Sequence, residues 1–288
     1  MRNPKAFIRN CLFTFLNQCE CASQLRRGGL SYKNVLNRVR ERQQIERDIR
    51  AGKSTFRIGT LSVQCLNPSS FTTLYDEIFF QQAYYFQAKR AAPRIIDCGA
   101  NIGLTLMYFK QLYPQSIVTG FEPHPAAHAM AKSNVENNNF TGVDLIQAAI
   151  SNHDGHAELK FVEGEIMAST LTNRLDERGC KADSTRVVTA RLRPWLQERV
   201  DFLKLDIEGA EGVVLADCQD LLSNVENIFV EGHWTRGQAD NSAAGIVGAL
   251  EKAGFNVLIL STEGNRSNSF QPLLNVRPIT SFIVYGTR

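Results

Sequence analysis

The chain has 288 residues, of which 43% are hydrophobic and 21% are charged, and this ordinary globular composition excludes a low-complexity chain. The net charge of +3 is too small to indicate an anionic partner by itself, and no apolar run reaches the ~18–20 residues that a membrane span needs. The seven cysteines are odd in number and scattered, so we expect no disulfide framework and a reducing, cytoplasmic location.

The positive charge is concentrated in a basic N-terminal arm. Residues 1–57 hold 13 lysines and arginines against 4 acidic residues, whereas the remainder holds 19 against 25. Ser31 to Arg50 has apolar residues at helical spacing with arginines on the other face, which predicts an amphipathic helix. We interpret residues 1–75 as a largely helical extension that forms a homo-oligomer contact or covers part of a binding site. The alternative is a non-enzymatic protein whose arm binds an anionic surface; no nucleic-acid partner is expected, because no aromatic residues interleave the basic run.

The next segments lead into a regular alternation of strands and helices. Thr55 to Leu66 alternates like strands, and Asp76 to Arg90 is predicted as a helix with an acidic first turn and a basic last turn. Pro93 ends that helix. The strands predicted after it are 94–100, 116–123, 143–151, 201–207, 227–233 and 255–261, and the helices between them are 102–112, 125–138, 210–222 and one that ends near Gly254.

This order predicts an α/β fold over residues 76–288, with a doubly wound, mainly parallel sheet, because parallel strands are joined by right-handed helical crossovers. Two patterns depart from the alternation. Ala157 to Val162 and Val187 to Leu192 predict a hairpin-like excursion around a polar loop. Thr280 to Gly286 predicts a last strand that pairs antiparallel at the sheet edge.

Acidic residues stand where the predicted parallel strands end. Four of the five strand ends are carboxylates, the five being Asp97, Glu122, Ala149, Asp206 and Glu231. In a doubly wound sheet, ligands bind beyond the carboxyl ends of the strands. A carboxylate at the end of an apolar strand is costly without a partner, so the four together predict a polar ligand rich in hydrogen-bond donors.

The motif IIDCGANIGLT forms the first strand-to-helix turn and narrows the class of ligand. Gly99 and Gly103 let backbone approach a ligand closely, and Asn101 readily takes a left-handed φ. The spacing lacks the middle glycine of the dinucleotide motif G-x-G-x-x-G, and no P-loop lysine follows. S-adenosylmethionine, which has no phosphate, fits better, since Asp97 suits its cation or a water and Glu122 suits its ribose hydroxyls. A nicotinamide-dependent oxidoreductase stays as an alternative, because Glu122 alone would serve that ribose equally well.

Four motifs in this order, IIDCGANIGLT, GFEPHP, FLKLDIEGAE and FVEGHW, resemble those of the FkbM-type S-adenosylmethionine-dependent methyltransferases. The resemblance runs from about Asp76 to Trp234. It implies the seven-stranded class I methyltransferase fold, S-adenosylmethionine as cofactor, and methylation of a hydroxyl oxygen on a sugar, polyketide or related metabolite. We expect the cofactor to bind Asp97, Gly99, Asn101, Gly103, Glu122 and Asp206, with Ala149 and Ile150 beside the adenine.

The acceptor side of the site is predicted from the ends of two neighbouring strands. Asp206, Glu231 and His233 would face the methyl group, and His233 is the one histidine of five at a predicted strand end on this rim. Two mechanisms fit these residues. In the one that we favour, His233 is a general base and no metal takes part; in the other, the three residues hold a divalent cation that lowers the pKa of the hydroxyl. Glu211, in the first turn of the next helix, is interpreted as mainly structural.

Further residues are predicted to contact the acceptor substrate. Glu208 lies in a strand-to-helix turn, and Trp234 follows the end of a predicted strand. Ser169 and Thr170 lie in Gly164 to Gly179, which interrupts the sheet pattern. This segment either forms a loop over the acceptor pocket or is a plain connection.

Overall fold

The computed structural model describes residues 32–162, 165–171, 182–234, 239–261 and 281–288. Contacts along the chain divide it into two compact units, Met1–Ala83 and Tyr84–Arg288. Among the described residues, no helix combines the length and the apolar character needed to cross a membrane.

In its described part, residues 32–83, the first unit contains two α-helices, a small hairpin and a π-helical turn. In chain order they are α2 (Tyr32–Arg50), β1 (Thr55–Ile58), β2 (Leu61–Gln64), α3 (Pro68–Tyr75) and η1 (Asp76–Phe80). The helix predicted up to Arg50 and the strands predicted over Thr55 to Leu66 are confirmed, and β1 and β2 pair antiparallel. Arg42 donates to the Asp76 carboxylate at 2.7 Å and the Tyr75 hydroxyl donates to the Arg38 carbonyl at 3.0 Å, so α2 is joined to the end of α3.

The helix predicted over Asp76 to Arg90 is wrong in its position. α3 begins earlier, because the Asn67 side chain accepts a hydrogen bond from a backbone N–H of the first turn and Pro68 fits that turn. Regular structure ends with η1, and Gln82 takes a left-handed φ of 58° that an α-helix does not contain. Residues 81–93 therefore hold neither helix nor strand.

A sheet of seven strands forms the centre of the second unit. The strands are β3 (Arg94–Cys98), β4 (Ile117–Phe121), β5 (Val143–Ile146), β10 (Val200–Leu205), β11 (Val225–His233), β12 (Asn256–Ser261) and β13 (Ser281–Thr287). Their order across the sheet is β12-β13-β11-β10-β3-β4-β5. From β11 to β5 all neighbours are parallel, and β13 runs antiparallel to both of its neighbours. The doubly wound, mainly parallel sheet predicted from the sequence is confirmed.

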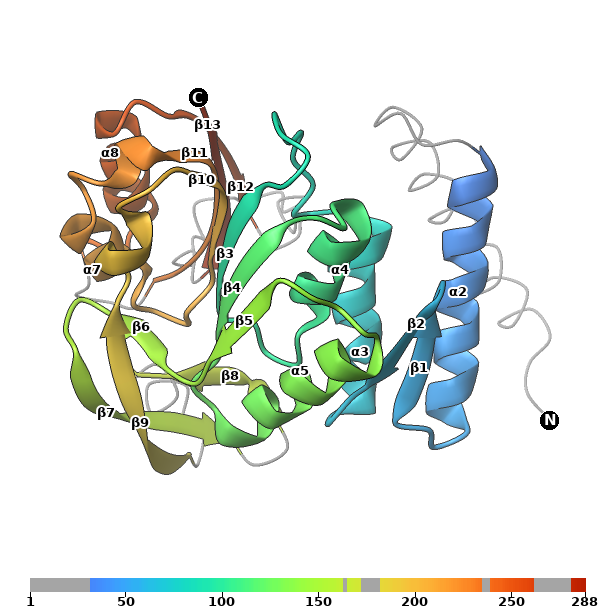
Figure 1. Ribbon diagram of the computed structural model, residues 1–288. Coiled ribbons are helices and arrows are strands. Elements are labelled where there is room, and N and C mark those ends of the chain that lie inside the picture. The colour runs from blue at the N-terminus through green and yellow to red at the C-terminus, as the bar shows by residue number, and fades with distance from the viewer. Residues whose placement is uncertain (1–31, 163–164, 172–181, 235–238, 262–280) are drawn as a thin grey trace, which may run out of the picture. The chain divides into compact units, whose positions relative to one another are not determined.

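Helices cover both faces of this sheet. They are α4 (Leu104–Leu112), α5 (Pro125–Asn137), α7 (Glu211–Asp217) and α8 (Ala243–Lys252). Figure 1 shows α4 and α5 on one face and α7 and α8 on the other. α7 is shorter than the helix predicted over 210–222, and a separate 3₁₀ turn, Leu222–Asn224, holds the end of that span.

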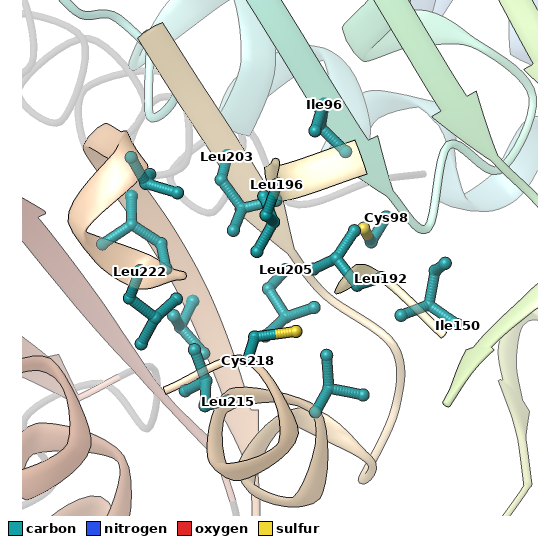
Figure 2. Close-up of a cluster of buried hydrophobic side chains, with 14 of the residues drawn as sticks. Ile96, Cys98, Ile150, Leu192, Leu196, Leu203, Leu205, Leu215, Cys218 and Leu222 are labelled. Atoms are coloured by element: carbon teal, nitrogen blue, oxygen red, sulfur yellow. The ribbon is translucent and has the colours of Figure 1, made fainter. Parts of the chain in front are cut away.

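The core beside α7 is apolar and packs against one face of the central strand β10. Figure 2 shows side chains of this core. Six of them are at most 1% exposed: Leu196, Leu203, Leu205, Leu215, Cys218 and Leu222. Because β10 is a central strand covered on both faces, all six of its residues are buried. Two of the six, Asp201 and Lys204, are charged, and a buried charge needs a partner.

The last strand is antiparallel as predicted, but it does not lie at the sheet edge. β13 lies between β11 and β12, so β12 forms the edge. This position depends on Gly232 of β11, because a Cβ there would lie 2.3 Å from the buried ring of Phe282. Only a glycine leaves room for that ring.

A second sheet has four strands, β6 (Ala149–Ser151), β7 (Gly155–Val162), β8 (Glu165–Thr170) and β9 (Asp183–Arg191). Its order is β6-β9-β7-β8, with β7 antiparallel to β9 and to β8. The predicted excursion is thus confirmed, but the continuous strand over 143–151 is wrong, because β5 ends at Ile146 and β6 pairs with β9 instead. β8 falls within the predicted loop over 164–179, whose remaining part lies mostly outside the described residues.

Candidate active site

The turn between β3 and α4 has a backbone shape that few residues allow. Gly99 and Gly103 have φ angles of 94° and 82°, and Asn101 has a φ of 49°. A Cβ on Gly99 would lie 1.9 Å from the backbone oxygen of Asp206, so this turn packs directly against the end of β10. The Asn101 side chain accepts from the N–H of Ile102 at 2.7 Å, which supports its left-handed conformation. The motif therefore brings backbone rather than bulky side chains to the edge where the parallel strands end.

Glu122 follows β4 directly and faces this turn. One carboxylate oxygen accepts from the Asn101 N–H and the other from the His124 N–H, each at 2.8 Å. Burial raises the pKa of Glu122 to about 7, although these two hydrogen bonds oppose the rise. Each oxygen keeps a further acceptor position, so this carboxylate can accept from a pair of adjacent hydroxyl groups.

A buried lysine connects the ends of β3 and β10. Lys204 Nζ lies 3.2 Å from Asp97 Oδ1 and 3.3 Å from Asp206 Oδ2, and it donates to the Gly99 carbonyl at 2.8 Å. Asp97 also accepts from the Thr105 hydroxyl. Burial alone would lower the pKa of Lys204, but the two carboxylates outweigh burial and raise that pKa. Lys204 is therefore a cation that holds both strand ends and the glycine turn in one arrangement.

His233, the last residue of β11, is paired with a buried glutamate. Its Nδ1 lies 3.0 Å from Oε1 of Glu211, which is fully buried at the start of α7. Glu211 also accepts from the Gly209 N–H and from the Asn241 side chain, and Asn241 in turn donates to the His233 carbonyl. These contacts fix the imidazole ring, with Nε2 directed away from Glu211.

On the Nε2 side of His233, the described residues include three more carboxylates. Glu208 Oε2 and Glu231 Oε1 each lie 3.6 Å from Nε2. Asp206, Glu208 and His233 each offer one possible metal-ligand atom, and these atoms lie within 4.8 Å of one another. The cluster of Asp206, Glu208, Glu231 and His233, called the acceptor cluster below, is thus rich in negative charge and suits a cationic ligand.

The charged groups of this cluster shift one another's pKa values. Burial alone would lower the pKa of His233, but the Glu211 hydrogen bond and the other carboxylates outweigh it and raise the pKa to about 9. Burial alone would raise the pKa values of Glu211 and Glu231, but His233 lowers both. For Asp206 burial prevails, and its pKa is raised.

The structure brings most of the predicted site residues to one edge of the large sheet. The residues in this group lie near or just beyond the ends of four strands, β3, β4, β10 and β11. They are Asp97, Gly99, Asn101, Gly103, Glu122, Asp206, Glu208, Glu231, His233 and Trp234. Asp97 is fully buried, so it contributes to the site by holding Lys204. Trp234 packs against the core beside α7 and α8.

The remaining predicted residues belong to the second sheet. Ala149 and Ile150 are buried in β6 and do not lie at the end of β5, where the sequence placed them. Thr170 of β8 is buried, and its hydroxyl donates to the Glu208 carbonyl at 2.5 Å. Ser169 precedes it and is half-buried. β8 therefore contacts the turn that carries Glu208.

Three residues of the site were not singled out for their roles by the sequence. The sequence could have indicated the role of Lys204. A lysine within the apolar run DFLKLDI is buried when that run forms a central strand, and a buried lysine needs a partner of opposite charge. Glu211 was interpreted as mainly structural, whereas it contacts His233 directly. Asn241 has no sequence pattern that separates it from a loop residue, and only the fold brings it to this pair.

The fold and the carboxylate-lined strand ends define a class I methyltransferase, and comparison with known proteins supports this class. Residues 97–257, more than half of the chain, match the family model described as the methyltransferase FkbM domain. The chain belongs to the FkbM methyltransferase family. It is therefore an enzyme, and the oxidoreductase and binding-protein alternatives are set aside.

Curated relatives extend over most of the enzyme domain. Methyltransferase 1 of Beauveria bassiana (strain ARSEF 2860) is 31% identical over 206 residues, which cover 65% of this chain and 81% of that protein. Methyltransferase sdnD of Sordaria araneosa is 30% identical, with coverages of 68% and 86%. The 31-O-demethyl-FK506 methyltransferase FkbM of Streptomyces tacrolimicus is 24% identical, also with coverages of 68% and 86%. A solved methyltransferase FkbM from Methylobacillus flagellatus KT has a TM-score of 0.46 at 11% identity, covering 76% of this chain and 52% of that one.

Proposed function

We propose that this enzyme transfers a methyl group from S-adenosylmethionine to a hydroxyl oxygen of a sugar, polyketide or related small molecule or glycan. The observation that carries the proposal is that Glu122 lies at the carboxyl end of β4 and the acceptor cluster at the carboxyl ends of β10 and β11, on either side of the glycine turn that follows β3. The FkbM relative, which is named as a 31-O-demethyl-FK506 methyltransferase, supports an oxygen acceptor.

The residues of this edge fit S-adenosylmethionine. The Gly99–Gly103 turn presents backbone without bulky side chains, and Glu122 can accept from both ribose hydroxyls. Asp206 remains about a quarter exposed, so one oxygen of its carboxylate is available to the cofactor's cationic amino group. Ala149 and Ile150 are the apolar residues that we propose to lie beside the adenine.

S-adenosylmethionine supplies a methyl group on a positively charged sulfur, and its transfer forms a carbon–oxygen bond, leaves the carbon–sulfur electron pair on sulfur and releases the hydroxyl proton. Asp206, Glu231 and His233 orient the acceptor hydroxyl and receive this proton within the acceptor cluster. Glu208 and Ser169 provide further polar contacts to the acceptor, whereas Thr170 and Trp234 shape the pocket through their packing.

Two measurements test this function. Calorimetry should show binding of S-adenosylmethionine and S-adenosylhomocysteine and no binding of NAD. Mass spectrometry of reactions with candidate sugars and polyketides should show a methylated product that needs both the acceptor hydroxyl and the cofactor. Binding of NAD without any response to S-adenosylmethionine would contradict the proposal.

A further inference from the structure

The acceptor cluster has the ligand types and the spacing of a metal site. We propose that Asp206, Glu208 and His233 bind one divalent cation of the Mg²⁺ or Mn²⁺ type, and that this cation holds the acceptor hydroxyl. Its role rests on the proposed function, because it supposes a hydroxyl acceptor. The inference departs from the metal-free mechanism favoured by the sequence, and the reason lies in how His233 is oriented.

The three residues match the coordination of a small divalent cation. Carboxylate oxygens and imidazole nitrogen are ligands that such cations accept. The ligand atoms lie within 4.8 Å of one another. With metal–ligand bonds of about 2.1 Å in an octahedral site, neighbouring ligand atoms are about 3 Å apart and opposite ones about 4.2 Å apart. The side chains of Asp206 and Glu208 are 24% and 19% exposed. Small rotations of these two side chains are therefore enough to bring the ligand atoms to the separations of an octahedral site.

The environment of His233 also points to a cation. Its side chain is only 4% exposed, and Nδ1 is held by Glu211. Nε2 faces Glu208 and Glu231 at 3.6 Å each, which is longer than a hydrogen bond. Once Nε2 gives up its proton, an imidazole that donates from Nδ1 to Glu211 offers its Nε2 lone pair on the side of these carboxylates, and a cation bound there satisfies the nitrogen and the carboxylates together. A carboxylate behind the imidazole is the usual support of a metal-binding histidine.

The lysine at this edge supplies only part of the positive charge that the acceptor cluster needs. Lys204 Nζ lies 3.3 Å from Asp206, and its other partners, Asp97 and the Gly99 carbonyl, belong to β3 and to the turn that follows it. Three carboxylates, those of Glu208, Glu211 and Glu231, lie beside the single imidazole of His233. A proton on His233 is the competing source of positive charge, and the experiment has to separate it from a metal.

A cation at these ligands also defines what happens to the hydroxyl proton. An oxygen bound to a divalent cation loses its proton more readily. Glu231 is not one of the three ligands, and it lies beside His233 to accept that proton. The oxygen then uses its electron pair to form the bond to the methyl carbon, while the carbon–sulfur pair stays on sulfur.

The test measures metal binding on the chain of 288 residues after metal removal with EDTA. Mn²⁺ is the probe, and binding is followed by calorimetry and by electron paramagnetic resonance. We expect one saturable Mn²⁺ per chain, with a nitrogen coupling from the imidazole that is absent in His233→Gln. Glu208→Gln and His233→Gln should each weaken binding about tenfold or more, since even outer-shell changes typically cost 10–100-fold. Glu251→Gln, on the exposed surface of α8, is the matched control and should bind Mn²⁺ as the wild type does.

The outcomes distinguish the metal site from the proposed function. No saturable Mn²⁺ binding, or equal binding by both variants when their melting curves show intact folds, overturns the metal site. Methyl transfer that continues at full rate in EDTA overturns the cation's role and leaves the proposed methylation standing. Mn²⁺ bound at these residues by a chain that does not bind S-adenosylmethionine supports the site and overturns the proposed function.

Discussion

His233 Nδ1 lies 3.0 Å from Glu211 Oε1, although the histidine ends β11 and the glutamate begins α7. The two residues meet because β11 is the parallel neighbour of β10, and α7 follows the turn after β10. Asn241 contacts both the Glu211 carboxylate and the His233 carbonyl. The orientation of the imidazole is therefore determined by three separate segments of the chain.

Replacing Glu211 by glutamine should lower the free energy of unfolding by about 1–3 kcal/mol, the usual cost of leaving a buried polar group unsatisfied. The glutamine amide nitrogen is a donor, and it would meet either the Gly209 N–H or the Asn241 amide, which are donors too. Urea denaturation measures the change. Glu198→Gln, at an exposed position, is the control and should leave the free energy of unfolding unchanged.

Lys204→Met should destabilise the fold by about 3–5 kcal/mol, because it leaves two carboxylates without their buried cation. One of the two carboxylates must then take up a proton, so the deficit relative to the wild type should be larger at pH 8 than at pH 5. Denaturation at the two pH values measures this difference. A deficit that does not change with pH would contradict the assignment, and Lys132→Met on the exposed side of α5 should have little effect at either pH.

Cofactor affinity should depend on pH through Glu122, whose pKa is raised to about 7 by burial. The ionised carboxylate accepts more hydrogen bonds from ribose hydroxyls than the protonated form does, so affinity should fall as pH drops from 8 to 6. Calorimetry with S-adenosylhomocysteine at several pH values measures this. Glu122→Gln should weaken binding by about 1.5–3 kcal/mol at pH 8 and should remove this component of the pH dependence. A wild-type affinity that is flat across this range would show that Glu122 does not hold the ribose.

Gly99→Ala should destabilise the fold by about 2–5 kcal/mol, because its Cβ meets the Asp206 backbone at 1.9 Å and the residue has a left-handed φ. Gly248→Ala is the matched contrast. A Cβ at Gly248 has no neighbour within 4 Å and the residue lies inside α8, so alanine should raise the free energy of unfolding by about 0.5–1 kcal/mol. Thermal or urea denaturation of both variants measures the change in the free energy of unfolding. It shows whether the loss at Gly99 comes from the close approach of the backbone or from any replacement of glycine by alanine.

The sequence by itself determined the class of sheet, the ends of its parallel strands and the conformation of the first turn. These features depend on local properties. Apolar runs of strand length that alternate with helical patterns predict parallel strands, and Gly99, Asn101 and Gly103 are residues that tolerate a positive φ wherever they occur. Glu122 and Asp206 could be found for the same reason, because each directly follows an apolar run.

Only the tertiary structure decided which of these segments are neighbours. The residues from Thr280 to Gly286 do not by themselves predict that β13 lies between β11 and β12. That position depends on Gly232 of β11, whose missing side chain leaves space for the ring of Phe282. Glu211 reaches His233 across 22 positions of the chain, and Lys204 reaches Asp97 across 107. A buried charge is stabilised by the partner that folding brings to it. The sequence therefore located the carboxylates of the site, and the packing of distant strands decided which cation, hydrogen-bond donor or ligand each of them meets.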